Sequence, residues 1–245
     1  MKFLIICILL AAPYFTPDDT PDGDAILLRV DKNVISDYKI TVSVMHVKSR
    51  RGERSIKSKS WIQGRIRSFT EYLEPAREQG TKMLKLEDQL WTYTPSTDRT
   101  IRISGHMLRQ SVMGSDLSYE DLMEDPRLHK LYTATTTGEA RIEGRECFIL
   151  DLIAREPEIA YYKRVIWVDK ERFVILKENR YAKSGRLLKT TEVSDIKNID
   201  GRWVATRVLF KDLLKTGDGT EFTLESISFE DHIPDHIFSK ASLRK

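Results

Sequence analysis

Alternating apolar and polar residues dominate the chain from residue 38 to residue 229. Apolar side chains recur at every second position, which is the spacing of a strand with one buried face. Roughly a dozen such segments follow one another, and hairpin-length turns such as Glu87-Asp88 and Ser184-Gly185 separate them. The predicted strands are 38–44, 58–63, 65–73, 81–87, 90–94, 99–104, 133–143, 147–154, 161–169, 172–181, 186–193, 202–212 and 220–229.

These short connections determine how the strands can pair. Parallel neighbours need a crossover of about a dozen residues or more, whereas antiparallel neighbours need only a tight turn. We therefore expect a mainly β (α+β) domain built on a single large antiparallel sheet. A sheet of this size must curl, so we expect an incomplete barrel whose concave face is covered by the helical segments of the chain.

Two helical stretches interrupt the strands. The first, about 24–35, places Ile26, Val30 and Val34 on one stripe. The second is an insertion at 105–125, where 106–112 can form two helical turns.

A second short helix is predicted within the insertion, at 119–124. Ser118 precedes it as the N-cap, and Asp121 lies three residues later in the position of a capping-box acid. Helices this short are not stable alone, so the apolar side of the insertion must pack on the concave sheet.

The insertion contains Met107, Met113 and Met123, half of the methionines in the chain. Two interpretations are open. The segment could simply fill the core of a one-sided β domain, or it could cover a cavity that binds apolar ligands, because methionine repacks easily around varied partners. Gly105 and Gly114 would then be hinges of a movable lid, and Arg109, the one strong charge in the apolar run, is our candidate for its latch.

Alternation along the flanking strands gives a candidate lining for such a cavity, together with the apolar residues of the insertion. The predicted ligand-binding residues are Val42, Val44, Leu84, Leu86, Trp91, Tyr93, Met107, Leu108, Val112, Met113, Leu122 and Met123. Trp61, Phe69, Tyr72 and Trp167 are further aromatic candidates. A slip of one residue would move each strand side chain to the opposite face.

The N-terminus has the pattern of a secretory signal. Lys2 precedes an apolar run at 3–12 that ends in small residues. The predicted organisation is a signal peptide at 1–15, a Pro/Asp-rich linker at 16–23 and one domain at 24–245. The cleavage site lacks an A-x-A pattern, so an uncleaved anchor remains an alternative.

Charge and motifs argue against nucleic acid binding and catalysis. Forty basic and 37 acidic residues leave a net charge of +3, and the signs are interspersed. The basic run at 48–59 is interpreted as two solvated strand ends around a turn, with phosphate binding as the minor alternative. No nucleophile elbow, P-loop, H-E-x-x-H or C-x-x-C motif occurs.

The cysteine and histidine residues that could serve in catalysis or metal binding also have simple structural explanations. Cys147, in an apolar run, is expected to be a buried thiol rather than a nucleophile. His232 and His236 are separated by Pro234 and are assigned to a turn rather than to zinc. His106 and His129 could orient a polar head group or cap a helix. We expect no cofactor, no metal and no enzymatic activity.

Three stretches are similar to a known family. They are GTKMLKL at 80–86, LWTYTPSTDRT at 90–100 and ISGHMLRQSVMGSDLSYEDL at 103–122. Together with Arg202-Trp203 and the 231–238 ending, they resemble the LolA-like outer-membrane lipoprotein-sorting protein family. The chain departs from the resemblance at Glu87-Asp88, where a glycine-containing turn is expected.

The resemblance implies a monomeric periplasmic carrier with a hydrophobic cavity. Its cargo would be lipid or an acylated lipoprotein, and its partners an inner-membrane transporter and an outer-membrane acceptor. The alternative on the same fold is a periplasmic sensor or adaptor that binds a lipid or lipoprotein signal and regulates or assists a membrane protein such as an exporter.

Overall fold

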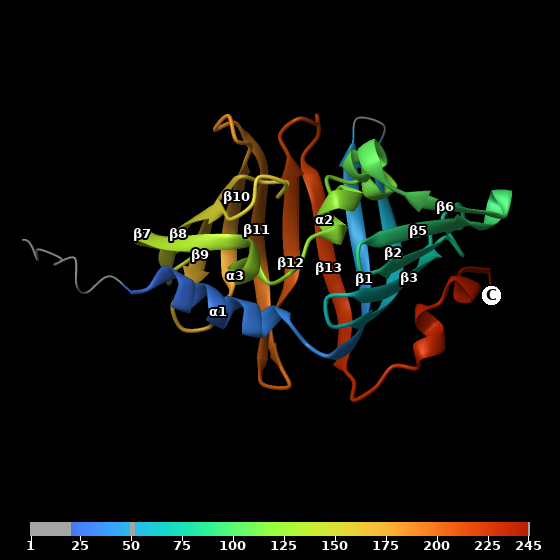
Figure 1. Cartoon of the computed structure of the whole chain (residues 1–245), viewed down its shortest axis with the longest axis horizontal. Coiled ribbons are helices and arrows are strands. Elements are labelled where there is room, and N and C mark those ends of the chain that lie inside the picture. The colour runs from blue at the N-terminus through green and yellow to red at the C-terminus, as the bar shows by residue number, and fades with distance from the viewer. Residues whose placement is uncertain (1–20, 50–51, 245) are drawn as a thin grey trace, which may run out of the picture.

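The computed structural model describes residues 21–49 and 52–244, and the predicted signal peptide lies outside them. Thirteen strands occur in this part of the chain (Figure 1). They are β1 (Tyr38–Ser49), β2 (Gly52–Gln63), β3 (Arg67–Glu74), β4 (Lys82–Leu86), β5 (Gln89–Thr94), β6 (Arg99–Ile103), β7 (Tyr132–Ile142), β8 (Arg145–Ala154), β9 (Lys163–Asp169), β10 (Ile175–Tyr181), β11 (Leu187–Ile199), β12 (Arg202–Asp212) and β13 (Gly219–Phe229).

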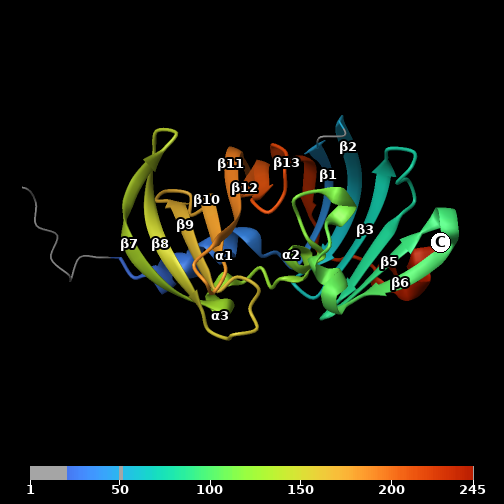
Figure 2. The same ribbon diagram turned by 90° about the horizontal axis from the view of Figure 1, so that it is seen from above.

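All of these strands belong to one antiparallel sheet. The spatial order is β6-β5-β4-β3-β2-β1-β13-β12-β11-β10-β9-β8-β7, so the first and last strands pair at its centre. The sheet curves (Figure 2), and β6 and β7 remain as its two edges among the described residues. The predicted mainly β fold with an incomplete barrel is confirmed.

Helices cover the concave face, which we call the inner face. They are α1 (Gly23–Val34), α2 (Tyr119–Met123) and α3 (Leu128–Leu131), with short 3₁₀ helices η2 (Gly105–Arg109) and η3 (Val112–Gly114) in the insertion (Figures 1 and 2). Three more 3₁₀ turns are η1 (Pro95–Thr97), η4 (Asp235–Phe238) and η5 (Lys240–Arg244). No helix in the described part of the chain combines the length and the apolar character that crossing a bilayer requires.

The second half of the insertion, with α2, agrees with the prediction, and the first half differs from it. The capping box is present, since Ser118 accepts from the Asp121 backbone N–H and the Asp121 carboxylate accepts from the Ser118 N–H. Of the two helical turns predicted at 106–112, the first part is present as the 3₁₀ helix η2, Gly105–Arg109, and the continuation through Ser111 is wrong. The chain is extended at Ser111, which forms a β-bridge with Ser118, so backbone pairing within the insertion replaces a continuous helix. Helix α3 was not predicted.

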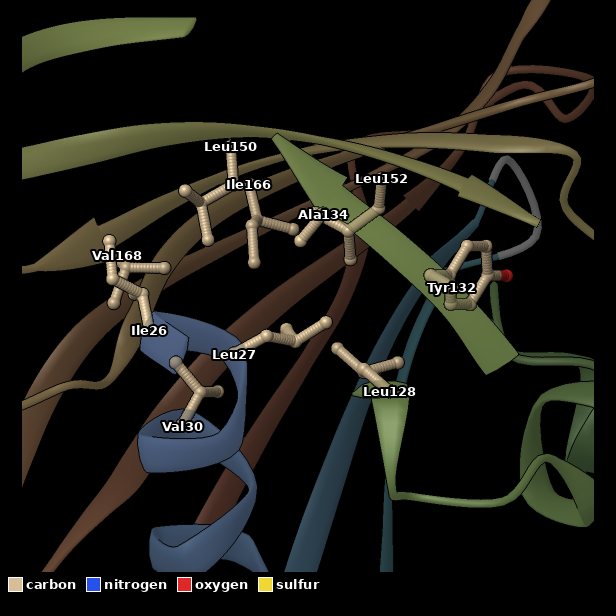
Figure 3. Packing of buried hydrophobic residues seen from close by; sticks show 10 residues of the cluster. All are labelled: Ile26, Leu27, Val30, Leu128, Tyr132, Ala134, Leu150, Leu152, Ile166 and Val168. Carbon is tan, nitrogen blue, oxygen red and sulfur yellow. The ribbon is translucent and has the colours of Figure 1, made fainter. Parts of the chain in front are cut away.

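Helix α1 packs on the half of the inner face formed by β7 to β10 (Figure 3). Ile26, Leu27 and Val30 point from the helix into a cluster with Leu150 and Ile166. The two sheet residues and Leu27 have no exposed surface. Each such aliphatic side chain contributes about 1.5–3 kcal/mol on burial, so this cluster holds the helix rigidly on the sheet.

The opposite face of β3 to β5, which we call the outer face, is covered by the C-terminal segment 231–244 (Figure 1). Ile233, Phe238 and Leu243 are buried there against Leu84 and Trp91. The sequence did not indicate this cover. Because of this cover, β3 to β5 are apolar on both faces. Alternation alone could therefore not show which of their side chains lie on the inner face and which on the outer face.

Candidate functional site

A cavity of about 340 Å³ lies on the inner face between the sheet and the insertion. Its floor comes from β1 to β4 and β13, and its walls come from the end of α1 and from the insertion. The residues that line it are Val34, Ile35, Lys39, Thr41, Ser43, Met45, Ser58, Ser60, Ile62, Gly64, Arg65, Arg67, Ser68, Thr70, Tyr72, Met83, Lys85, Leu90, Val112, Leu117, Leu122, Glu124, Pro126 and Phe222. Its volume is within the range of small-molecule sites.

A second cavity of about 290 Å³ adjoins the first beside α1. Trp203, Ile227 and Phe229 are among its residues, and Val34 and Lys39 line both cavities. The two hollows therefore meet at the end of α1 and the start of β1. Together they extend along the middle of the inner face, between the α1 half and the insertion half.

The insertion roofs the first cavity through apolar packing. Val112 is buried in a cluster with Met45, Ile56 and Tyr72. Six partly buried residues of the insertion pack on the same cluster: Met107, Leu108, Met113, Leu117, Tyr119 and Met123. The predicted packing of the insertion on the concave sheet is confirmed for these residues.

Buried charges attach α2 to β10 and β11. The Asp121 carboxylate pairs with Arg180 at 3.2 Å and with Lys189, and it accepts from the Tyr161 hydroxyl at 2.6 Å. Burial by itself favours the neutral acid, but Lys189 and Arg180 outweigh it and lower the pKa of Asp121 to about 2. The carboxylate therefore stays ionised at neutral pH and holds the insertion to the sheet.

The same network continues to the residue that ends α2. Arg164, 2 % exposed, pairs with Glu124 and with Glu178, the second pair at 2.7 Å. Arg180 also pairs with Glu178 at 2.8 Å. Burial opposes ionisation of Glu178, yet Arg180 and Arg164 lower its pKa to about 2. The insertion is thus attached to β9, β10 and β11 by mutually compensating buried ions.

Further contacts attach the insertion to β2, β4 and β13. Arg54 donates to the Met113 carbonyl, and Lys85 donates to the Met123 carbonyl at 3.2 Å. The Asp116 carboxylate accepts from Thr220 at 2.8 Å. Arg109, the predicted latch, is exposed, and its side chain has no hydrogen bond or ion pair to another described residue. The contacts that attach the insertion come instead from residues of the sheet, which lie far from it in sequence.

Both predicted hinge glycines have positive φ, at +55° for Gly105 and +71° for Gly114. A Cβ at Gly114 would lie 2.5 Å from the Arg54 guanidinium, whereas a Cβ at Gly105 would meet open space. Both positions thus require a conformation that favours glycine. Their role as hinges stays a prediction.

Half of the predicted cavity lining lies on the other face of the sheet. Leu84, Leu86, Trp91 and Tyr93 belong to the outer cluster under the C-terminal segment. Their neighbours Met83, Lys85 and Leu90 line the cavity instead.

The same correction applies to β1, β2, β3 and β9. Val42 and Val44 alternate with Thr41, Ser43 and Met45, which face the cavity. Trp61 and Phe69 lie in the outer cluster, and Trp167 alternates with the inner Ile166 and Val168. Of the named aromatic candidates, Tyr72 lines the cavity. The predicted inner face was one residue off, because the choice rested on alternation alone, which does not identify which face is buried inside.

Among the predicted insertion residues, Val112 and Leu122 line the cavity directly. Met107, Leu108, Met113 and Met123 pack on the cluster beside it. The residues that sequence reasoning missed are mainly the hydroxyls and lysines of the floor. Alternating Ser/Thr in β1 to β3 was visible in the sequence, but it was assigned to the solvent face.

The described residues contain no group of His, Cys, Asp and Glu arranged to hold a metal ion. Cys147 is fully buried, and burial raises the pKa of its thiol. His129 is held by Asp31, whose carboxylate also accepts the backbone N–H groups of Leu128 and His129. That arrangement joins α3 to α1. The cavity therefore offers apolar surface, hydroxyls and cations, which are groups suited to binding.

A protein-family model and several solved structures are similar to this chain. A protein-family model described only as an uncharacterized protein matches residues 64–245. No curated protein matches the sequence. The structure is similar to that of a DUF1329 family protein from Desulfovibrio piger, with a TM-score of 0.82, 25 % identity, and coverage of 90 % of this chain and 97 % of that chain.

Two further solved structures are similar, and their names refer to lipoprotein sorting and to the LolA superfamily. A putative outer membrane lipoprotein-sorting protein domain from Vibrio parahaemolyticus has a TM-score of 0.77 and 24 % identity, covering 91 % of this chain and 98 % of that one. A LolA superfamily protein from Nitrosomonas europaea has a TM-score of 0.74 and 25 % identity, covering 90 % and 99 %. The chain therefore belongs to the family of the model that matches residues 64–245, and its fold is that of the LolA superfamily and lipoprotein-sorting structures named here.

Proposed function

We propose that the chain is a periplasmic carrier that binds lipid, or the acyl chains of lipoproteins, and moves this cargo toward the outer membrane. The single observation that carries the proposal is the cavity on the inner face under a separately attached apolar roof. The likeness to a lipoprotein-sorting protein domain and to a LolA superfamily protein supports the same class of ligand.

The cavity offers enough apolar contact to hold an acyl chain. Met45, Tyr72, Val112, Leu117 and Phe222 form one end of it. A buried methylene contributes about 0.8 kcal/mol, so a tail with ten buried methylenes gains about 8 kcal/mol. That gain corresponds to a dissociation constant in the micromolar range, before the entropic costs of association are subtracted. Binding of this strength allows both capture and release.

The roof is built so that it can separate from the sheet. Helix α2 has five residues and is held by ion pairs and half-buried side chains rather than by a continuous core. When the insertion leaves the sheet, water would hydrate both charges of each ion pair. The cost of opening would therefore be modest, because no single charge would stay buried without its partner. Gly105 and Gly114, both at positive φ, precede α2 in the insertion and would be the hinges of this movement.

The proposal also covers the organisation and surroundings of the chain. Residues 1–15 would direct export, 16–23 would be a linker, and 24–245 would form one monomeric carrier domain. Loading would require an inner-membrane donor, and unloading would require an outer-membrane acceptor. The function is one of binding and transfer, with no chemical step.

Native mass spectrometry of protein gently purified from an envelope fraction tests the proposal. We expect bound lipid in the wild type and its loss in Leu117→Asp, because burying a carboxylate against an acyl chain is costly. Ile153→Asp is the matched control, since Ile153 is 38 % exposed on the far half of the sheet. Far-UV circular dichroism should show that both variants fold.

Two results would contradict the carrier function. One is wild-type protein that carries no lipid and takes up no acylated probe. The other is a folded Leu117→Asp variant that takes up lipid as well as Ile153→Asp does.

A further inference from the structure

Polarity in the first cavity changes systematically along the strands. The sheet register places its floor residues in rows that run across β1, β2, β3 and β4. The first row is Lys39, Ile62, Ser68 and Lys85. All four line the cavity, so this row has a lysine at each end.

The next rows carry hydroxyls, and the last is apolar. The second row is Thr41, Ser60, Thr70 and Met83, and the third is Ser43, Ser58 and Tyr72. Met45 follows on β1, packed with Val112 and Phe222. Six residues at about 3.4 Å each separate Lys39 from Met45, so the gradient from cations to hydrocarbon extends over about 20 Å.

Neither lysine has a carboxylate partner within salt-bridge distance among the described residues. The Lys39 ammonium contacts the Val34 carbonyl at 3.2 Å. The Lys85 ammonium contacts the carbonyls of Leu122 and Met123. Burial lowers the pKa of both ammonium groups, and at Lys39 the nearby Arg202 lowers it further, whereas at Lys85 the Asp125 and Glu124 carboxylates oppose part of the effect. Each cation is thus partly desolvated without a carboxylate in direct contact.

The other charged groups of the lining are already paired. Glu124 pairs with Arg164, Arg65 with Asp125 at 3.5 Å, and Arg67 with Asp235 at 2.9 Å. The free charge in the cavity is therefore positive. A purely hydrocarbon ligand would leave both lysines facing methylenes, which is costly. Four of the six Ser/Thr hydroxyls already pair with one another, Ser43 with Ser58 and Ser60 with Thr70. An anionic oxygen head group would accept charge-assisted hydrogen bonds from the lysines.

We propose that the cargo of this cavity is an anionic amphiphile, whose carboxylate or phosphate lies at the Lys39–Lys85 row and whose tail extends toward Met45 and Val112. The inference rests on the proposed lipid-binding function and specifies its ligand class. Lys39 and Lys85 are then the residues that determine head-group specificity. The Ser68 hydroxyl lies in the same row, and those of Ser60 and Thr70 lie in the next row, as further donors to the head group.

Isothermal titration calorimetry below the critical micelle concentration tests this assignment. The probes are dodecyl phosphate, dodecanoate and dodecan-1-ol, which share one tail, and inorganic phosphate, which has none. We expect both alkyl anions to bind at least about tenfold more tightly than the alcohol. Inorganic phosphate alone should not bind in the same concentration range, because it lacks the tail.

Variants separate the head-group site from the tail site. Two variants are tested: Lys39→Met alone, and Lys39→Met combined with Lys85→Met. Both should reduce the affinity for the anions toward that for the alcohol, while the affinity for the alcohol stays within about threefold of the wild-type value. Lys82→Met is the matched control, because Lys82 lies on the same strand as Lys85 and faces away from the cavity. Lys39→Met alone keeps the test valid if loss of the Lys85 contacts to α2 disturbs folding.

Three outcomes overturn the inference, and they are distinguishable. Equal affinity for the alkyl anions and the alcohol refutes the head-group assignment and leaves the carrier function intact. Binding of inorganic phosphate as tight as that of dodecyl phosphate refutes an amphiphile as the ligand. Absence of binding by all three alkyl probes refutes the carrier function and this inference with it.

Discussion

Replacing Arg164 with methionine should destabilise the protein strongly at neutral pH, because it removes the cation shared by two buried carboxylates. Arg164 is 2 % exposed, and it pairs with Glu178 on β10 and with Glu124 at the end of α2. Methionine has a similar length, so the substitution removes charge and hydrogen bonds while keeping most of the volume. Breaking a buried pair by removing one partner typically costs about 3–5 kcal/mol.

The pKa of Glu178 gives a second estimate. Arg180 and Arg164 outweigh burial and lower it from 4.5 to about 2. Each unit corresponds to about 1.4 kcal/mol, so the environment favours the ionised form by about 3 kcal/mol. This agrees with the expected cost of leaving Glu178 without Arg164, since Arg180 can compensate only part of it.

The sign of the pH dependence follows from the same shift. The folded-state pKa of Glu178 lies below the unfolded value, so its contribution is fully present above about pH 4.5 and is lost as the pH falls toward 2. Asp121, with a pKa lowered to about 2, changes in the same direction. Through Glu178 alone, wild-type stability should fall by about 2 kcal/mol between pH 7 and pH 3.

Urea denaturation followed by tryptophan fluorescence at pH 7 and pH 3 measures both effects. We expect Arg164→Met to lower the free energy of unfolding by about 3–5 kcal/mol at pH 7, and the difference from wild type to shrink at pH 3. Lys177→Met is the control, because Lys177 is a half-exposed lysine on β10 that pairs with Glu192 at 3.5 Å. Exposed pairs contribute about 0–1 kcal/mol.

The reasoning would be refuted by a variant as stable as Lys177→Met at pH 7. It would also be refuted by a difference between Arg164→Met and wild type that is the same at both pH values. Either result would mean that Glu178 and Glu124 find other partners or remain hydrated in the folded protein.

Two further predictions concern the insertion and the outer face. In thermal denaturation, Gly114→Ala should be more destabilising than Gly105→Ala, although both glycines have positive φ. The reason is that only Gly114→Ala displaces Arg54 from the Met113 carbonyl. Equal effects of the two substitutions would show that this contact contributes nothing. Phe238→Ala should lower the free energy of unfolding by about 3–5 kcal/mol, since Phe238 is 5 % exposed in the outer cluster; a loss below about 1 kcal/mol in urea denaturation would show that the C-terminal segment is dispensable.

Local sequence signals predicted most of the secondary structure. Alternation located the strands, since each spans at least five residues with turn-forming residues between them. The capping box at Ser118 was readable because both partners lie within one helical turn. The predicted helix at 106–112 failed beyond Arg109 because Ser111 pairs with Ser118 instead, a choice that depends on how the insertion folds back on itself.

The candidate site was predicted only in part. The role of the insertion as the roof followed from its apolar side chains, and Val112 and Leu122 do line the cavity. The floor was assigned to the wrong face of β4 and β5, where Met83 and Leu90 line the cavity while Leu84 and Trp91 lie on the outer face. A strand buried on both faces carries no period-two signal that identifies which face is which.

Periodicity and turn length are local properties, so the amino-acid pattern predicts one antiparallel sheet with two helical interruptions. Which face encloses the cavity, and which cations hold the roof, depend on tertiary packing. Lys39 and Lys85 are far apart in the chain and share one row through strand register, and Arg164 meets Glu124 through the packing of the insertion on the sheet. Register depends on packing across the whole sheet, so the polarity of the cavity emerges only when the sheet has formed.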